Sequence, residues 1–132
     1  MIEELAISTK GKNAFIDVTS EVEKAVTGLR VKSGVCIIFV PHTTAALTIN
    51  ENADSSVRSD IINALKNVVP DSGGYLHAEG NSPAHVKASL FGNSLTIPVE
   101  NGSLRLGTWQ GIYLCEFDGP RTRKIIIKVL NG

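Results

Sequence analysis

The three histidines are the residues whose placement most directly indicates chemistry, because all fall at expected boundaries between elements. His42 follows an apolar run, His77 lies in a loop behind two glycines, and His85 is one turn into an expected helix. Loops on a rigid scaffold concentrate binding groups, and imidazole nitrogens are common zinc ligands. Two interpretations stay open: a zinc site at His42, His77 and His85, or rings that only satisfy loop hydrogen bonds.

Three acidic residues stand close to the histidines in the sequence, namely Glu51, Asp54 and Glu79. Carboxylates can act as general bases, and they are the ligands that Mg²⁺ prefers beside substrate phosphates. Asp54 also has the place of a helix N-cap, and Glu51 can be a solvated loop charge. Catalytic and structural roles are therefore both open for these side chains.

Two positions suit an anionic ligand. A helix start at Ser82, preceded by Asn81, presents free backbone N–H groups and the positive end of the helix dipole. Arg121 and Arg123 flank a turn, where a guanidinium can bind phosphate through two hydrogen bonds. The alternative for the helix start is an ordinary capped helix, and the alternative for the arginines is a charge on an edge strand. The single tryptophan, Trp109, either stacks on a heterocycle or fills the core.

The apolar patterning predicts an α+β domain over residues 1–132 that is rich in antiparallel sheet. Strands are expected at 2–8 and 13–19 as an opening hairpin, then at 35–40, 94–99, 110–117 and 122–130, with 118–121 as a tight hairpin connection. The continuous apolar run at 35–40 predicts a central strand buried on both faces, which 47–49 extends or pairs with. Helices are expected from Thr19 or Ser20 to 29, over 54–66 after an Asp54 cap, and over 82–91.

Composition narrows the classes of protein. The 132 residues are 42% hydrophobic and 20% charged, which fits one folded domain and excludes a disordered chain. Thirteen basic and thirteen acidic side chains give a formal net charge of +0, so neither nucleic acid nor an anionic membrane is an expected partner. No apolar stretch reaches the ~18 residues of a membrane span, and we expect a cytoplasmic protein. Cys36 and Cys115 lie in apolar runs and are expected to be inert core thiols.

Four segments, read in order, resemble one family: HTTAALTINENAD, YLHAEGNSPAHVKASLFG, IPVENGSLRLGTWQGIY and EFDGPRTRKIIIKV. They are similar to the secondary thiamine-phosphate synthase family, the YjbQ-like proteins, over nearly the whole chain. The motif residues carried over by this resemblance are His42, Thr43, Thr44, Asn50, Glu51, Asp54, His77, Glu79, Asn81, Ser82, His85, Thr108, Gln110, Glu116, Asp118 and Arg121.

The resemblance implies a mixed, mainly antiparallel β-sandwich with two or three helices, assembled as a homotrimer. It also implies a weak thiamine-phosphate synthase reaction, which joins a hydroxymethylpyrimidine diphosphate to a thiazole phosphate. This resemblance implies that Glu51, Asp54, Glu79 and His85 are catalytic. It implies that the substrate is bound by Thr43, Thr44, Asn50, Asn81, Ser82, Thr108, Gln110 and Arg121. Zinc is expected at the histidines and Mg²⁺ with the diphosphate, with no organic cofactor. A binding module for a small phosphorylated ligand or a metal, or a metal-dependent phosphoester hydrolase, is the alternative.

Overall fold

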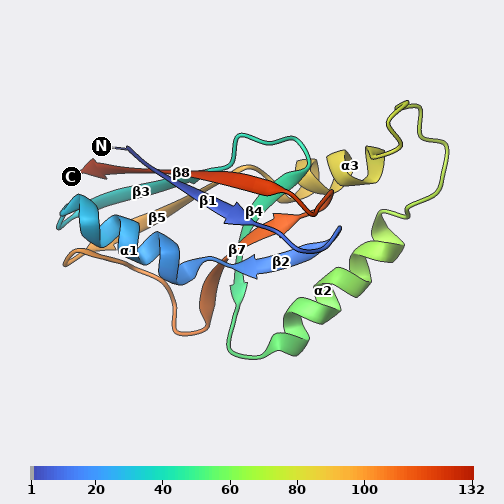
Figure 1. Ribbon diagram of the computed structural model, residues 1–132. Coiled ribbons are helices and arrows are strands. Elements are labelled where there is room, and N and C mark those ends of the chain that lie inside the picture. The colour runs from blue at the N-terminus through green and yellow to red at the C-terminus, as the bar shows by residue number, and fades with distance from the viewer. Residues whose placement is uncertain (1) are drawn as a thin grey trace.

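The structure is a computed structural model that describes residues 2–132. Its elements follow one another along the chain as β1 (Ile2–Ser8), β2 (Ala14–Asp17), α1 (Thr19–Leu29), β3 (Gly34–Phe39), β4 (Ala45–Glu51), α2 (Ser55–Val68), α3 (Ser82–Phe91), β5 (Ser94–Glu100), β6 (Ser103–Leu104), β7 (Gln110–Glu116) and β8 (Thr122–Asn131). The first and last strands lie side by side, with both termini at the same end of the molecule (Figure 1).

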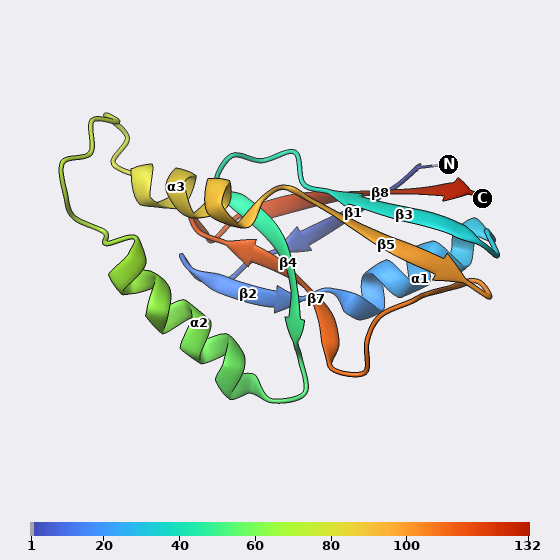
Figure 2. The same ribbon diagram turned by 180° about the vertical axis from the view of Figure 1, so that it is seen from behind.

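Two antiparallel sheets and a helical layer build the fold. One sheet has the strand order β1-β8-β3-β5-β6, and the other has the order β2-β7-β4. Helices α2 and α3 lie on the side of the three-stranded sheet away from the five-stranded one, while α1 lies near the chain termini (Figures 1 and 2). The expected α+β sandwich with three helices is therefore confirmed.

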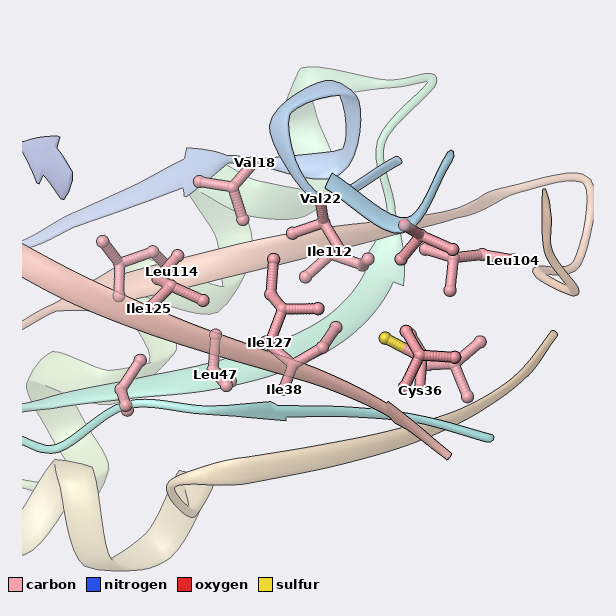
Figure 3. Close-up of a cluster of buried hydrophobic side chains, with 14 of the residues drawn as sticks. Val18, Val22, Cys36, Ile38, Leu47, Leu104, Ile112, Leu114, Ile125 and Ile127 are labelled. Atoms are coloured by element: carbon pink, nitrogen blue, oxygen red, sulfur yellow. The ribbon is translucent and has the colours of Figure 1, made fainter. Parts of the chain in front are cut away.

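The main hydrophobic core fills the space between the two sheets and α1. Alternate residues of β8, namely Ile125, Ile127 and Val129, point into it because successive side chains of a strand face opposite sides. Val22 and Val26 of α1 close the same core, as the spacing predicts. Figure 3 shows Val22 among the core side chains. Each fully buried aliphatic side chain contributes about 1.5–3 kcal/mol of transfer free energy.

A second, smaller cluster lies between the three-stranded sheet and helices α2 and α3. Phe15, Tyr113 and Phe117 form its aromatic centre, with the Phe15 and Phe117 ring centroids 6.4 Å apart. Helix α2 covers this cluster with partly buried residues only, and its N-cap is Asp54, whose Oδ1 accepts the Ser56 N–H at 2.9 Å. The predicted cap is confirmed, and this role competes with a catalytic one.

Both expected hairpins are wrong, because each connection crosses between the sheets. Strands β1 and β2 belong to different sheets, and so do β7 and β8. The two crossing segments bind each other: Thr9 N–H donates to the Arg121 carbonyl at 2.9 Å, and Gly119 N–H donates to the Lys12 carbonyl at 3.1 Å. Mutual pairing of the two turns replaces the within-hairpin pairing that the sequence suggested.

Strand β3 is central in its sheet, as predicted, but it is not buried on both faces. Cys36 and Ile38 point into the core, whereas Val35 and Phe39 keep 37% and 38% of their surface exposed. No helix of the described chain covers the outer face of the five-stranded sheet (Figure 1). The segment 47–49 belongs to β4, which pairs with β7 in the other sheet rather than with β3.

Three further expectations concern the cap of α1, the two cysteines and membrane-spanning helices. Val18 occupies the N-cap position of α1, and Thr19 instead donates its hydroxyl to Asp17 Oδ1 at 2.6 Å, so neither Thr19 nor Ser20 caps the helix. The two cysteines are buried free thiols, as expected, and burial raises the pKa of Cys36 to about 11. Within residues 2–132, none of the helices has the length and apolar character needed to cross a membrane.

Candidate functional site

Two adjoining hollows open where α3 meets the ends of β4 and β7. The first, of ≈ 320 Å³, is lined by Thr43, Thr44, His77, Glu79, Asn81, His85, Asp118 and Arg121. The second, of ≈ 490 Å³, is lined by His42, Thr43, Ala45, His85, Ala88, Ser89, Gly92 and Asn93. Thr43 and His85 border both hollows, so we treat them together as the His85 cleft. Four loops and one helix thus supply its polar side chains.

The floor of the His85 cleft rests on a buried ion pair between Glu116 and Arg123. Arg123 Nε donates to Glu116 Oε1 at 2.9 Å, and its Nη2 donates to Glu116 Oε2. The same Nη2 donates to the carbonyl and to Oγ1 of Thr44, at 3.1 and 2.9 Å. Thr44 Oγ1 therefore accepts a hydrogen bond from Arg123, which leaves its hydroxyl hydrogen free to donate to a ligand.

Glu116 has further donors that stabilise its charged form. Burial alone raises the pKa of this carboxyl, but hydrogen bonds from Arg123, Thr9 and the Asp118 N–H together hold the pKa below its usual range. The Thr9 Oγ1 to Glu116 Oε1 distance is 2.7 Å, and the Asp118 N to Oε2 distance is 3.0 Å. A charged, fully partnered Glu116 thus fixes where the 118–121 turn begins.

Arg121 lies at the rim of the cleft, and Asp118 and Asn81 hold its surroundings in place. Its Nε donates to the Asp118 carbonyl at 2.9 Å, and its Nη2 donates to Asp118 Oδ2 at 3.0 Å. Asn81 Nδ2 donates to the same Oδ2 at 2.9 Å. A guanidinium has five N–H donors, so three remain available on this half-exposed side chain. Arg123, by contrast, points into the protein and pairs with Glu116, so of the two arginines only Arg121 is placed to bind a phosphate.

His77 and His85 meet inside the cleft. Their ring centroids are 5.4 Å apart and the planes are nearly perpendicular, at 87°. The sequence step of eight residues closes because the loop turns back at Gly80, whose N–H donates to the His77 carbonyl at 3.1 Å and whose φ is +76°. Glu79 Oε1 lies 4.0 Å from His77 Nε2. Two imidazoles and a carboxylate at this spacing can exchange protons with a bound ligand.

His42 faces the other hollow and has a defined tautomer. Its Nε2 accepts the Lys124 backbone N–H at 2.9 Å, so the proton of the neutral ring resides on Nδ1. Burial, followed by the nearby positive charge of Arg123, lowers the pKa of His42 below its usual range. The ring is therefore neutral at neutral pH and offers an Nδ1–H donor to the cleft.

These positions do not gather the zinc set expected from the sequence. Among residues 2–132, no cluster of three or more histidine, cysteine, aspartate or glutamate side chains is placed to hold a metal ion. The neutral His42 ring also has no free lone pair, because Nε2 is an acceptor and Nδ1 carries the hydrogen. A zinc ion bound by all three histidines does not fit this arrangement.

Five other expected site residues lie at the opposite end of the β4–β7 ladder. Ala45 pairs with Glu116 beside the cleft, whereas Glu51 pairs with Gln110 six residues away. At ~3.3 Å per residue this separates the two ends by roughly 20 Å. The residues concerned are Asn50, Glu51, Asp54, Thr108 and Gln110, and within one chain they do not meet the histidines.

Ser82 departs from the sequence interpretation, and one of the two alternatives for Trp109 is excluded. Ser82 begins α3 but does not border the cleft, where Asn81 takes that position instead. Trp109 keeps 63% of its surface exposed, which rules out the core role. Asp118, which the resemblance carried over as a motif residue without a role, borders the cleft and binds Arg121. Its place just before a Gly-Pro turn, two residues after the end of β7, was the local signal.

Comparison with known proteins gives a consistent result. The family model described as UPF0047 protein YjbQ-like matches residues 3–132. The UPF0047 protein of Methanocaldococcus jannaschii is 47% identical over 131 residues, which cover 99% of this chain and 95% of that protein. YugU of Bacillus subtilis is 48% identical over 132 residues, which cover 99% of this chain and all of the relative.

Solved structures agree in fold. A crystal structure of an uncharacterized conserved protein from Clostridium acetobutylicum has a TM-score of 0.94 at 53% identity, covering 97% of this chain and 99% of that one. A protein of unknown function from Sulfolobus solfataricus has a TM-score of 0.95 at 35% identity, covering 100% and 97%. The chain therefore belongs to the UPF0047, YjbQ-like family.

Proposed function

We propose that this protein is a transferase for small phosphorylated heterocycles, of the thiamine-phosphate synthase type, and that the His85 cleft is its active site. The observation that carries the proposal is the convergence of Arg121, the Thr43 and Thr44 side chains and the His77–His85 pair on one hollow. This set combines anion-binding donors with imidazole rings, which can donate or accept a proton.

The reaction joins two heterocycles. The ring nitrogen of a thiazole phosphate forms a bond to the methylene carbon of a hydroxymethylpyrimidine diphosphate, while the bond from that carbon to oxygen breaks. The electron pair of the broken bond leaves with the diphosphate. Arg121, with three unused N–H donors, and the Thr44 hydroxyl are the groups that stabilise the charge developing on this leaving group.

The carboxylates of the cleft have a complementary part in the proposal. Glu79 and Asp118 border the same hollow as Arg121. Positive charge that develops on the pyrimidine methylene is stabilised by such a neighbouring carboxylate, and Mg²⁺ arriving with the diphosphate is also bound by carboxylate oxygens. The His77–His85 pair supplies a proton to the departing diphosphate.

A second candidate function is binding or hydrolysis of a phosphorylated ligand without group transfer. The exposure of the cleft favours it: the side chains of His77 and Glu79 are 42% and 75% exposed. Transfer to a second substrate competes best with water when the site excludes solvent. An open cleft therefore suits a phosphate-binding module or a phosphoester hydrolase as well.

Turnover separates these functions. The purified protein is incubated with hydroxymethylpyrimidine diphosphate, thiazole phosphate and Mg²⁺, and thiamine phosphate is quantified after oxidation to its fluorescent thiochrome derivative. The proposal expects product from the wild type, at least about tenfold less from Arg121→Ala, and unchanged product from the surface control Arg105→Ala. Diphosphate hydrolysis without thiamine phosphate would establish the hydrolase alternative instead, and binding without turnover would establish the binding module.

A further inference from the structure

Lys87 is a buried lysine outside the His85 cleft that the proposed reaction does not use. It belongs to α3, two residues beyond His85, but only 6% of its surface is exposed, and its side chain points toward the aromatic cluster rather than the cleft. Lysine is almost never this buried unless a carboxylate pairs with it. The surroundings of its ammonium group therefore need an explanation.

The Lys87 ammonium has one direct polar partner. Its Nζ donates to Asn13 Oδ1 at 2.9 Å and lies 5.6 Å from the centre of the Phe117 ring. Among the described residues Lys87 takes part in no ion pair, as the four pairs that form involve other side chains. An ammonium group has three N–H donors, so the other two have no direct protein acceptor.

Two small hollows meet at Lys87. One of ≈ 50 Å³ is lined by Asn13, Phe15, Ile62, Leu65, Lys66, Asp71, Lys87 and Phe117. The other, of ≈ 20 Å³, is lined by Lys12, Asp71, Gly80, Asn81, Pro83, Ala84, Lys87, Phe117 and Asp118. A water-sized probe needs about 10–15 Å³, so the larger hollow accepts roughly three to five non-hydrogen atoms. The space suits a very small organic molecule beside the amine.

We propose that Lys87 is a nucleophilic amine that forms a Schiff base with a small, uncharged aldehyde entering this hollow. Its walls are apolar at Phe15, Leu65 and Phe117, with Asp71 as an acidic group on the same lining. An amine placed among apolar and aromatic side chains, with a carboxylate at the rim, is the environment in which lysine reacts with carbonyl compounds.

The chemistry balances without a further reagent. The ammonium group first loses one proton, for which Asp71 or water is the acceptor. The neutral nitrogen then bonds to the carbonyl carbon, and the nitrogen's proton moves to the carbonyl oxygen. Loss of water leaves a carbon–nitrogen double bond.

The charged groups around Lys87 have opposing effects on the loss of a proton from its ammonium group. Burial lowers the pKa of the Lys87 ammonium below its usual range, the Asp71 carboxylate raises it, and Lys12 lowers it. Lys66 from α2 and Asp118 from the turn after β7 also border the hollows. Burial is the strongest of these influences, so a larger share of neutral amine is available than at a surface lysine.

Reductive trapping tests the proposal on the full chain. The protein is incubated with glycolaldehyde and cyanoborohydride at pH 7, which converts an imine to a stable secondary amine, and each lysine is followed by peptide mass spectrometry. We expect Lys87 to be modified at least about tenfold faster than Lys66, the exposed lysine on the same hollow, because the hollow holds the aldehyde beside the Lys87 amine.

A pair of arginine variants provides the control. Lys87→Arg retains a positive charge and should abolish the fast modification, whereas Lys24→Arg, at an exposed lysine of α1 that lines neither hollow, should leave the Lys87 rate unchanged. Modification of Lys87 no faster than that of Lys66 in the wild-type protein overturns the proposal and leaves Lys87 as a tether for Asn13. The wild-type rates decide this outcome even if a variant fails to fold, and they are independent of thiamine-phosphate synthesis.

Discussion

Glu116 and Arg123 form a buried, two-point ion pair that is connected to the His85 cleft through Thr44 and Asp118. The guanidinium also binds Thr44, and the carboxylate also binds the Asp118 N–H. Because Glu116 is fully buried and the Arg123 side chain is 3% exposed, water cannot replace either partner. The pair thus connects the stability of the sandwich to the position of the cleft's floor and turn.

Breaking this pair should be costly. Removing one member of a buried ion pair typically destabilises a protein by about 3–5 kcal/mol, because it leaves the other charge without a partner. We expect this loss for Arg123→Met in urea unfolding followed by circular dichroism. The double variant with Glu116→Leu should lose clearly less than the sum of the two single changes. A loss below about 1 kcal/mol for Arg123→Met would contradict the assigned role.

The same pair predicts an acid-sensitive fold. The pKa of Glu116 is lower in the folded protein than in the unfolded chain, so unfolding takes up a proton at low pH. Its stabilising contribution is complete above the ordinary glutamate pKa of about 4.3 and is lost as the pH falls through the lower, folded value. Melting temperatures from pH 6 to 3 should fall in that acidic window, and less steeply in Glu116→Gln. Parallel curves would contradict this assignment.

His42 should be neutral and protonated on Nδ1 at pH 7. Its pKa is lowered in the folded state, so protonation opposes folding and the related stability declines as the pH drops below about 6.5. Two-dimensional ¹H–¹⁵N spectra of the imidazole distinguish the tautomers. An Nε2–H ring would show that the bond from Lys124 N–H does not set the tautomer, and a His42 pKa above 6.5 would contradict the effect of burial and of Arg123.

The outer face of the five-stranded sheet supports the proposed homotrimer. Val35 pairs with Leu130 and Phe39 pairs with Ile126 on adjacent strands, and three of these four side chains are among the exposed large apolar residues. An exposed apolar patch of this kind marks an interaction site. Light scattering at micromolar concentration should give about three times the 14.1 kDa chain mass, and Phe39→Glu should reduce it. A wild-type monomer would exclude the trimer.

Elements with strong local signals were predictable from the sequence, because residues close together in the chain determine their apolar periodicity and their caps. Asp54 caps α2, and Val22 and Val26 face the core, as their spacing indicates. The pairing of strands was not predictable in the same way. Strand β1 pairs with β8, which lies at the other end of the sequence. No local pattern distinguishes this pairing from a hairpin of β1 with β2.

The candidate site likewise contains features that local sequence signals predicted and features that depend on the tertiary structure. Loop residues after β3 and before α3 converge as the boundaries suggested, so Thr43, His77 and His85 meet. Residue type alone did not separate Arg121 from Arg123, although one faces the cleft and the other is buried. Strand alternation decides this, because in β8 odd-numbered residues point inward and Arg121 precedes the strand.

Pyrophosphate binding tests the central claim most directly. Isothermal titration of the protein with pyrophosphate, with and without Mg²⁺, measures recognition of the proposed leaving group apart from turnover. We predict saturable binding by the wild type, at least about tenfold weaker binding by Arg121→Ala, which corresponds to about 1.4 kcal/mol, and unchanged binding by Arg105→Ala. Equal affinity of a folded Arg121→Ala and the wild type, or no binding to either, would contradict the assignment of the His85 cleft as a phosphate site.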